Sequence, residues 1–321
     1  MPGRRVVVVG SINEDHVLKV DALPLRGETV IAVAATRASG GKGANQAVAA
    51  ARCGVSTLLV GALGTDGQAV RLEGELRAHT VDTARLHRIP GSSGTAVVIV
   101  DRGGDNCIVV ESGANAQLSP GFVLKSLADL GSGDVVLVQC EIPVAAVRAA
   151  IEHAGAVGAT VVLNWSPSVP LPDDVVSHTT VLVVNRREAE ALLGPPADSA
   201  SDGRELATAL SGRYGIDVVV TLGADGAVCR TGDRLTRIEA VPVTSAVIDS
   251  TGAGDTFAGT LAAALAAGVP LADAVRRACA AAADAVTALG AQPRAHTPQA
   301  SSMPSGDPCT AVHPPTSPLG D

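Results

Sequence analysis

The stretch Val6-Val-Val-Val-Gly10-Ser-Ile-Asn13-Glu-Asp15 joins a short apolar run to a glycine and then to polar side chains. Similar apolar runs recur at residues 58–63, 135–138, 161–163, 181–184 and 218–222. Because they do not alternate with polar residues, they are typical of strands buried on both faces. Alanine-rich stretches of helical period lie between them, for example residues 44–53 and 143–156. The pattern predicts an α/β fold with a mostly parallel central sheet flanked by helices on both faces.

Two segments depart from this rhythm, residues 15–36 and 95–110. Both alternate apolar and polar residues around Pro, Gly and Asp, as half-exposed antiparallel strands do. We therefore expect a small second sheet beside the large one. From residue 292 onward the chain is rich in proline. This change in composition predicts a disordered tail at residues 292–321, after a single α/β domain at residues 1–291.

The composition argues against several classes of protein. Lys and Arg number 24 against 32 Asp and Glu, a net charge of −8, whereas a nucleic-acid-binding protein usually has a positive balance. No apolar stretch of the sequence approaches the roughly 20 residues that a membrane helix needs. The first residues lack the apolar segment of a signal peptide, and the six cysteines form no C-x-x-C pair. We expect a cytoplasmic protein with reduced thiols that binds neither nucleic acid nor membrane.

The stretch Asp249-Ser-Thr-Gly-Ala-Gly-Asp255-Thr-Phe-Ala-Gly259 is the strongest candidate for a reactive site. A helix is expected to begin among its glycines, where free N–H groups and the positive end of the helix dipole favour an anion. Asp255 stands in the first turn, and a carboxylate beside an anion site is the arrangement of a general base. A second interpretation has about equal weight from this motif alone: Asp255 only complements the helix dipole above a tight turn.

A second glycine cluster, Ser39-Gly-Gly-Lys42-Gly-Ala-Asn45-Gln46, also opens a helix. It matches neither the phosphate-binding G-x-x-x-x-G-K-[ST] loop nor the dinucleotide-binding G-x-G-x-x-G turn, and it contributes Lys42 and Asn45 as polar donors. Polar groups also follow the expected strands, at Asn13, Asp15, Gln139, Glu141, Asn185, Glu188 and Thr221. Each alone is more often a cap or a turn. The carboxyl ends of parallel strands nevertheless meet at one edge, where open α/β sheets bind ligands.

Taken in order, these motifs resemble the ribokinase-like carbohydrate kinase family. The resemblance extends from residue 5 to about residue 293. It rests on Gly10-Ser-Ile-Asn13-Glu-Asp15-His, Gly40-Gly-Lys-Gly-Ala-Asn45-Gln, Asn185-x-x-Glu188, Thr221-Leu-Gly-x-x-Gly226 and Asp249-x-Thr-Gly-Ala-Gly-Asp255-Thr-Phe. It implies ATP-dependent phosphorylation of D-ribose, or a similar small sugar, at its terminal 5-hydroxyl. In such an enzyme Asp255 would be the general base, and N–H groups around Gly252, Ala253 and Gly254 would form the anion hole.

The resemblance also implies a site for each ligand. The sugar would lie on Asn13, Asp15, Gly41, Lys42, Gly43, Asn45, Glu141 and Asp255. ATP, with its phosphates and Mg²⁺, would lie on Asn185, Glu188, Thr221, Gly223, Gly226, Gly252, Ala253, Gly254 and Cys279. A monovalent cation such as K⁺ would be held at Asp249, Thr251, Ala285, Ala288 and Gly290. The alternating segments, about residues 13–38 and 94–111, would form a lid over the sugar and pair two subunits in a homodimer.

Two alternatives remain open from the sequence. One is a kinase for another acceptor, such as 2-deoxyribose, fructose or adenosine. Aromatic residues make up only 1% of the chain, which disfavours a nucleoside because its base would need a stacking partner. The other alternative is a catalytically silent sugar-binding protein of the same fold. That alternative predicts loss of the base or of the anion-hole glycines, and the sequence keeps both.

Overall fold

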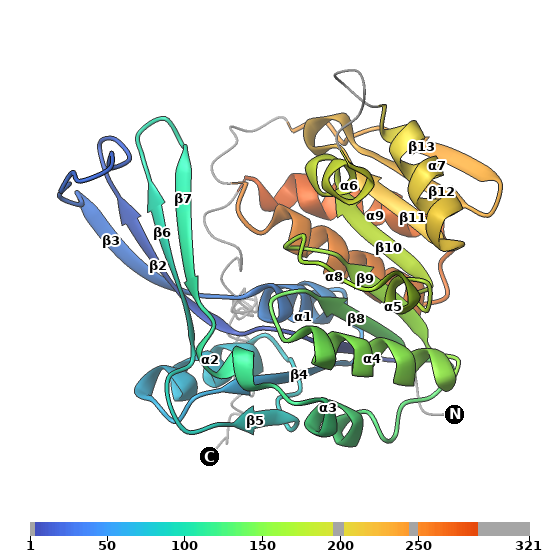
Figure 1. Ribbon diagram of the computed structural model, residues 1–321, viewed down its shortest axis with the longest axis horizontal. Helices are drawn as coiled ribbons and strands as arrows, with labels where there is room; N and C mark the ends of the chain where they lie inside the picture. The colour runs from blue at the N-terminus through green and yellow to red at the C-terminus, as the bar shows by residue number, and fades with distance from the viewer. Residues whose placement is uncertain (1–3, 195–201, 244–249, 288–321) are drawn as a thin grey trace, which may run out of the picture.

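The computed structural model describes residues 4–194, 202–243 and 250–287. Within these residues the largest sheet has nine strands, in the order β13-β12-β11-β10-β9-β8-β1-β4-β5 (Figure 1). The strands are β1 (Val6–Val9), β4 (Thr57–Leu63), β5 (Leu86–Arg88), β8 (Val135–Gln139), β9 (Thr160–Asn164), β10 (Val181–Asn185), β11 (Asp217–Thr221), β12 (Ala227–Thr231) and β13 (Arg234–Ile238). Every pair from β5 to β11 is parallel. The predicted parallel sheet is confirmed, since each of the six apolar runs coincides with one of its strands.

Strand β1 shows why the sheet is covered on both sides. Its alternate residues belong to different cores: Val6 and Val8 pack into one, and Val7 and Val9 into the other. One face is covered by α1 (Lys42–Arg52), α2 (Gly67–Ala78), α8 (Ala253–Ala266) and α9 (Leu271–Ala285). The other is covered by α3 (Pro120–Ser126), α4 (Val144–Ala156), α5 (Asp173–Val176), α6 (Arg186–Leu193) and α7 (Gly203–Tyr214).

The sequence pattern did not predict strands β12 and β13. Both run antiparallel at the edge of the sheet, beyond β11. Their residues mix charged and apolar side chains, for example Arg234-Leu-Thr-Arg-Ile238, so no continuous apolar run marks them. Only β13 is the outermost strand, which needs no such run because it is not buried on both sides. In β12 the buried stretch Ala227–Cys229 is short and is followed at once by Arg230.

A second sheet with the order β3-β2-β6-β7 stands to one side of the large sheet (Figure 1). Its strands are β2 (Asn13–Lys19), β3 (Ala34–Gly40), β6 (Gly94–Val100) and β7 (Asn106–Glu111). The predicted second sheet is therefore confirmed. We expected only antiparallel pairs, however, and that detail is wrong, because β2 and β6 are parallel. Both strands leave the carboxyl edge of the large sheet, β2 after β1 and β6 after β5, so they run in the same direction.

The expected strand over residues 15–36 is also interrupted. Residues 20–33 form a loop between β2 and β3. A turn at Leu25–Glu28 closes with the Glu28 N–H donating to the Leu25 carbonyl at 2.9 Å, and Gly27 in this turn has φ of +85°. Pro24 and Gly27 both favour a turn over a strand, and here they outweigh the alternating pattern.

Two other expectations concern the C-terminal tail and the absence of membrane helices. The tail at residues 292–321 lies outside the described residues, and the single domain ending at residue 291 stays a prediction. In the parts of the chain that the structure describes, every helix is too short or too polar to cross a membrane.

Candidate active site

The bend between β1 and β2 meets the start of α1 at the carboxyl edge of the large sheet. Ser11 Oγ donates to Glu141 Oε2 at 2.5 Å, and the Lys42 N–H donates to the same oxygen at 3.0 Å. The Gly43 N–H donates to Ser11 Oγ at 3.3 Å. Glu141, which follows β8, thereby joins both segments to the sheet. The sequence reasoning did not single out Ser11, although its place beside Asn13 in the first motif was an available signal.

Glycines at this edge allow other parts of the chain to approach closely. A Cβ on Gly40 would stand 2.1 Å from the carboxylate of Asp15, and a Cβ on Gly43 would stand 2.5 Å from the backbone of Gly10. Gly41, which precedes α1, has φ of +85°, a conformation that other residues rarely adopt. The cluster therefore packs α1 against the end of β1 and leaves room for the Asp15 side chain.

Strand β2 presents Asn13 and Asp15 on one side and Glu14 on the other, because side chains alternate along a strand. The Glu14 side chain is buried, and its carboxylate forms an ion pair with Arg71 of α2. This contact holds the first residues of β2 against the large domain. Asn13 and Asp15 are thus positioned from behind and are available to a ligand on their own side.

Asn115 orients the side chain of Asn13. It lies in a short 3-10 helix, η1 (Gly113–Gln117), and is fully buried. Its Oδ1 accepts from the Ile12 N–H at 3.0 Å, and its Nδ2 donates to the Ile12 carbonyl at 3.0 Å and to Asn13 Oδ1 at 2.8 Å. Since the Ile12 N–H can only donate, the oxygen of Asn115 must face it. The Asn13 oxygen therefore faces Asn115, and the Asn13 NH₂ group points away as a donor.

The sequence reasoning missed Asn115. It lies 102 residues from Asn13 along the chain, and neither charge nor a motif marked it. Gly94 of β6 makes space for this pair, because a Cβ there would stand 2.2 Å from both Asn115 Nδ2 and Asn13 Oδ1.

Helix α8 begins where the glycine pattern predicted. Gly252, its N-cap, has φ of +80°, in the left-handed region. The Thr256 N–H donates to the Gly252 carbonyl at 2.8 Å and makes the first bond of the helix. The N–H groups of Gly254 and Asp255 precede this bond, so the helix itself offers them no carbonyl partner. They and the helix dipole form a place where an anion is stabilised.

The Asp255 side chain is buried and points toward α1. Its Oδ2 accepts from Asn45 Nδ2 at 3.0 Å, and its Oδ1 accepts from Gln46 Nε2 at 2.9 Å. The two helices come together at Gly259, where a Cβ would stand 2.4 Å from the Gln46 carbonyl oxygen. Both oxygens of the carboxylate are therefore held by amide donors, which fix its orientation. Gln46 was quoted within a motif but not assigned a role.

Four carboxylates and one ammonium group interact at this edge. Burial raises the pKa of Asp15 to about 7, and the charges of Glu141 and Asp255 contribute to the rise. Burial lowers the pKa of Lys42, but the carboxylates of Asp255, Glu141 and Glu188 outweigh that effect and leave this pKa above its usual value. Lys42 therefore stays charged among the carboxylates, and Asp15 changes protonation near neutral pH.

The predicted nucleotide residues begin at the ends of β10 and β11. Asn185 caps α6: its Oδ1 accepts from the Glu188 N–H at 2.9 Å, and its own N–H donates to Glu188 Oε2 at 2.8 Å. Asn185 pairs in register with Thr221 of β11. Gly223 and Gly226 flank the turn that follows, and a Cβ on Gly226 would stand 2.1 Å from a carbonyl oxygen of β13. Five predicted residues thus gather at the ends of two adjacent strands.

Cys279 lies apart from this group, on α9. Burial raises the pKa of its thiol to about 11, and Cys229 of β12 contributes to the rise. The thiol is therefore protonated at neutral pH, and it presents an apolar surface where the resemblance implied a contact to ATP.

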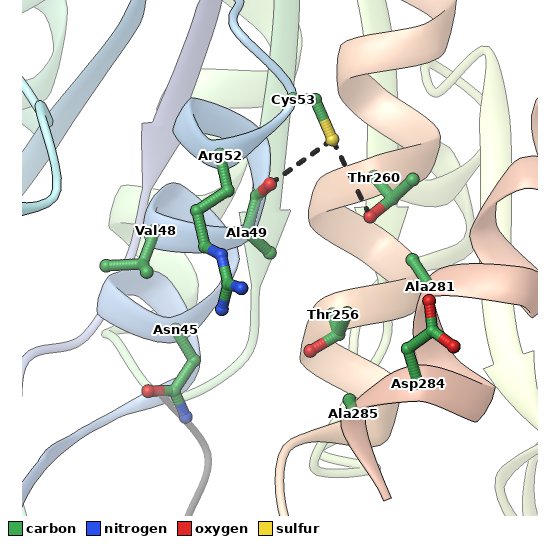
Figure 2. Close-up of a pocket in the computed structure, with 10 residues that line it drawn as sticks. All are labelled: Asn45, Val48, Ala49, Arg52, Cys53, Thr256, Thr260, Ala281, Asp284 and Ala285. Atoms are coloured by element: carbon green, nitrogen blue, oxygen red, sulfur yellow. Dashed lines mark hydrogen bonds between the residues drawn. The ribbon is translucent and has the colours of Figure 1, made fainter. Parts of the chain in front are cut away.

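A pocket of about 270 Å³ opens between α1, α8 and α9 (Figure 2). Among the predicted sugar residues only Asn45 lines it, together with Thr256, which follows Asp255 in the chain. Arg52 and Asp284 face it from opposite sides. The pocket adjoins the cluster of Asp15, Lys42 and Glu141 rather than containing it.

The structure describes only some of the residues predicted to bind the monovalent cation. Thr251 lies just before α8 and Ala285 ends α9, where it lines this pocket. Asp249, Ala288 and Gly290 lie outside the described residues. Across residues 4–194, 202–243 and 250–287, no group of three or more His, Cys, Asp or Glu side chains is placed to hold a metal ion.

Comparison with known proteins agrees with this geometry. The model of the pfkB family of carbohydrate kinases matches residues 4–298. The chain is 36% identical to ribokinase of Bacillus subtilis over 290 residues, which covers 90% of this chain and 95% of that protein. It is 32% identical to deoxyribokinase of Salmonella typhi over 259 residues, covering 80% and 84%.

Solved structures show the same fold. The crystal structure of ribokinase from Thermotoga maritima superposes with a TM-score of 0.80 at 30% identity, covering 90% of this chain and 95% of that one. The structure of Arabidopsis thaliana ribokinase complexed with ribose and ATP superposes with a TM-score of 0.79 at 28% identity, with the same coverage.

The fold is that of a sugar kinase that uses ATP. This chain belongs to the pfkB family of carbohydrate kinases. The family resemblance in the sequence is therefore confirmed, whereas the individual site residues stay predictions.

Proposed function

We propose that this protein is a ribokinase, which transfers the γ-phosphoryl group of ATP to the 5-hydroxyl of D-ribose. The observation that carries the proposal is the placement of Asp255. Its buried carboxylate lies in the first turn of α8, beside the first N–H groups of that helix, and both of its oxygens accept from α1. The similarity to ribokinases along nine-tenths of the chain supports ribose as the acceptor.

In this reaction Asp255 takes the proton from the 5-hydroxyl of the sugar as its oxygen attacks the γ-phosphorus. The bond to the leaving oxygen of ADP breaks as the new O–P bond forms. We assign the N–H groups of Gly252, Ala253 and Gly254 to the negative charge on the transferring group, because fixed donors contribute most to phosphoryl transfer. Without a ligand the Ala253 N–H donates to the Ser250 carbonyl at 3.3 Å, a bond that it would exchange for the phosphoryl oxygen. General-base catalysis of this kind contributes about 10² to 10⁴ in rate.

The sugar is held by short amides and carboxylates, which match the hydroxyls of a furanose. The donors are the Asn13 NH₂ group, Asn45 and Lys42, and the acceptors are Asp15 and Glu141. We assign the backbone of Gly41 and Gly43 to the same site, because Gly41 precedes α1 and Gly43 stands in its first turn. The scarcity of aromatic residues disfavours a nucleoside acceptor.

The donor set fits Mg²⁺ with ATP. Only Oε2 of the Glu188 carboxylate is bonded to the Asn185 N–H, so Oε1 can act through water on a magnesium ion that binds phosphate oxygens. We assign Thr221, Gly223, Gly226 and Cys279 to the nucleotide. Bound Mg²⁺ would neutralise phosphate charge during transfer.

A monovalent cation also fits the described part of its predicted site. Thr251 and Ala285 lie at facing ends of the packed helices α8 and α9, and main-chain carbonyls at such ends suit K⁺. Asp249, Ala288 and Gly290 complete the proposed set.

We further propose that the small sheet is a lid and the contact between two subunits. Exposed apolar side chains lie on both edges of it, at Leu25, Ile31 and Val33 in the loop between β2 and β3 and at Ile108, Val109 and Val110 on β7. Exposed apolar surface of this kind favours association. The cysteines of the described residues are free thiols, which agrees with the cytoplasmic location that we propose.

The deciding experiment measures ADP release from Mg²⁺–ATP with D-ribose, 2-deoxyribose, fructose or adenosine, each with K⁺ or Na⁺. Turnover highest on ribose and raised by K⁺ is the expected result. Highest turnover on 2-deoxyribose would favour the second candidate, which the Salmonella relative supports. No turnover with any acceptor, from folded protein, would instead favour a silent sugar-binding protein.

The substitution Asp255→Asn tests the proposed base. It keeps the size of the side chain and removes its basicity, so kcat should fall about 10²- to 10⁴-fold. Turnover equal to that of the wild type would overturn the assignment of Asp255 and leave the fold and family untouched.

A further inference from the structure

A chain of buried amides lies beneath Asp255, and the proposed reaction does not use it. Gln46 of α1 and Gln139 of β8 are completely buried, and Asn164 of β9 is nearly so. Gln46 Nε2 donates to Asp255 Oδ1 and to Asn164 Oδ1, both at 2.9 Å. Gln139 Nε2 donates to Gln46 Oε1 at 2.7 Å. Burying amides is costly unless they are hydrogen-bonded, and an apolar residue would have filled the same space in the core.

The protein backbone determines which group donates and which accepts in this row of hydrogen-bonded amides. Asn164 Nδ2 donates to the Val183 carbonyl on β10 at 3.3 Å. Because a carbonyl can only accept, the oxygen of Asn164 must point to Gln46. The group that Gln46 turns toward Asn164 and Asp255 is therefore its NH₂, and its oxygen faces Gln139. Both hydrogens of Gln46 are committed to acceptors, so Gln46 can only donate to Asp255.

We infer that Gln46 is a positioning residue for the general base. Through the amides of Gln139 and Asn164 it is anchored to three neighbouring strands, and it holds Asp255 Oδ1 as a hydrogen-bond acceptor. The carboxylate is thus held in one orientation before the sugar arrives, which lowers the reorganisation needed for proton transfer. This inference rests on the proposed function.

Other charged groups also act on Asp255, and the test must separate their effects from that of Gln46. Those on the elements packed around it, or in the adjoining pocket, are Asp15, Lys42, Glu141, Arg52 and Asp284. The tested substitution leaves all of them in place. The side-chain amides of Asn45 and Gln46, by contrast, donate hydrogen bonds directly to the Asp255 carboxylate.

The substitution Gln46→Glu replaces the donating NH₂ with an oxygen of nearly the same size. The introduced carboxyl group and Asp255 would then share one proton, because two adjacent carboxylates do not both ionise readily. We expect kcat at pH 7.5 to fall about 100-fold, and the acid limb of the kcat–pH profile to move alkaline by about one pH unit or more. The KM for ribose should stay within about threefold of the wild-type value, since Gln46 lies behind the base.

Two further variants make the test specific. Gln46→Met keeps the length of the side chain but donates nothing, and it should lower kcat about 10-fold, the effect of one hydrogen bond to a charged group, with no alkaline shift. Gln117→Glu makes the same chemical change at an exposed position at the end of η1. This control should behave as the wild type in both kcat and pH profile. Cooperative thermal unfolding of each variant confirms that it is folded.

Several results would overturn the inference. These are wild-type kcat and pH profile in both Gln46 variants, a rise in the KM for ribose with unchanged kcat, or a further loss when Gln46→Met is added to Asp255→Asn. If Gln46→Glu does not fold, the kcat of Gln46→Met decides the test: a wild-type value would overturn the inference. A wild-type protein without turnover on any sugar would overturn the proposed function as well, so the two failures are distinguishable.

Discussion

The substitution Asp15→Asn should stabilise the protein above neutral pH while weakening sugar binding. Asp15 is half-buried beside Gly40 and shares the site edge with Glu141 and Asp255. Burial and these two charges raise its pKa from the ordinary 3.8 to about 7. The folded protein therefore holds a proton on Asp15 that the unfolded chain has already released. An amide at this position has no charge to bury, so it avoids this cost.

The size of the effect follows from linkage. A carboxyl group with a raised pKa in the folded state destabilises the protein as the pH rises above its unfolded value, and the cost levels off above the folded value. From 3.8 to about 7, at roughly 1.36 kcal/mol for each pKa unit, the ceiling is about 4 kcal/mol. Relaxation and water penetration reduce this, so we expect Asp15→Asn to gain about 1–3 kcal/mol at pH 8, and little at pH 4.

Urea unfolding of both proteins at pH 4, 6 and 8 measures this difference. The matched control is Asp105→Asn, which removes one carboxylate from an exposed loop of the lid and should not change the pH dependence. In kinetic assays, loss of a charged acceptor should raise the KM for ribose about 10- to 100-fold. An Asp15→Asn protein whose stability follows that of the wild type at every pH would refute the reasoning about its burial.

Three other substitutions test the packing around the site. Gly259→Ala inserts a methyl group 2.4 Å from the Gln46 carbonyl, so it should cost about 1–3 kcal/mol in urea unfolding and lower kcat by moving α8 away from α1. Asn115→Ala leaves the Ile12 N–H and carbonyl without their side-chain partner; we expect a loss of about 2–4 kcal/mol and a higher KM for ribose with little change in the KM for ATP. Gly226→Ala forces a side chain into φ of +83° and should destabilise the turn by about 1–3 kcal/mol, which calorimetry would show, and raise the KM for ATP more than that for ribose.

Most of the fold was predictable because its signals are local. Six apolar runs marked the buried strands, and the glycines on either side of Ala253 marked the start of α8. Strands β12 and β13 were missed. The outermost strand, β13, needs no apolar run, and the buried stretch of β12 ends after three residues at Arg230. The parallel pairing of β2 with β6 was also missed. It depends on the direction in which each strand leaves the large sheet, which no short segment of sequence contains.

By itself, the sequence determined the α/β class, the glycines that open α1 and α8, and the residue types that a sugar kinase needs at the ends of its strands. Only the tertiary structure decided which of them act on one another. It placed Asn45 and Gln46 on the two oxygens of a carboxylate more than 200 residues away, and Asn115 on Asn13. It also raised the pKa of Asp15 by burying it beside two other carboxylates. Hydrogen-bond direction and desolvation depend on neighbours in space, so they arise only when the chain has folded.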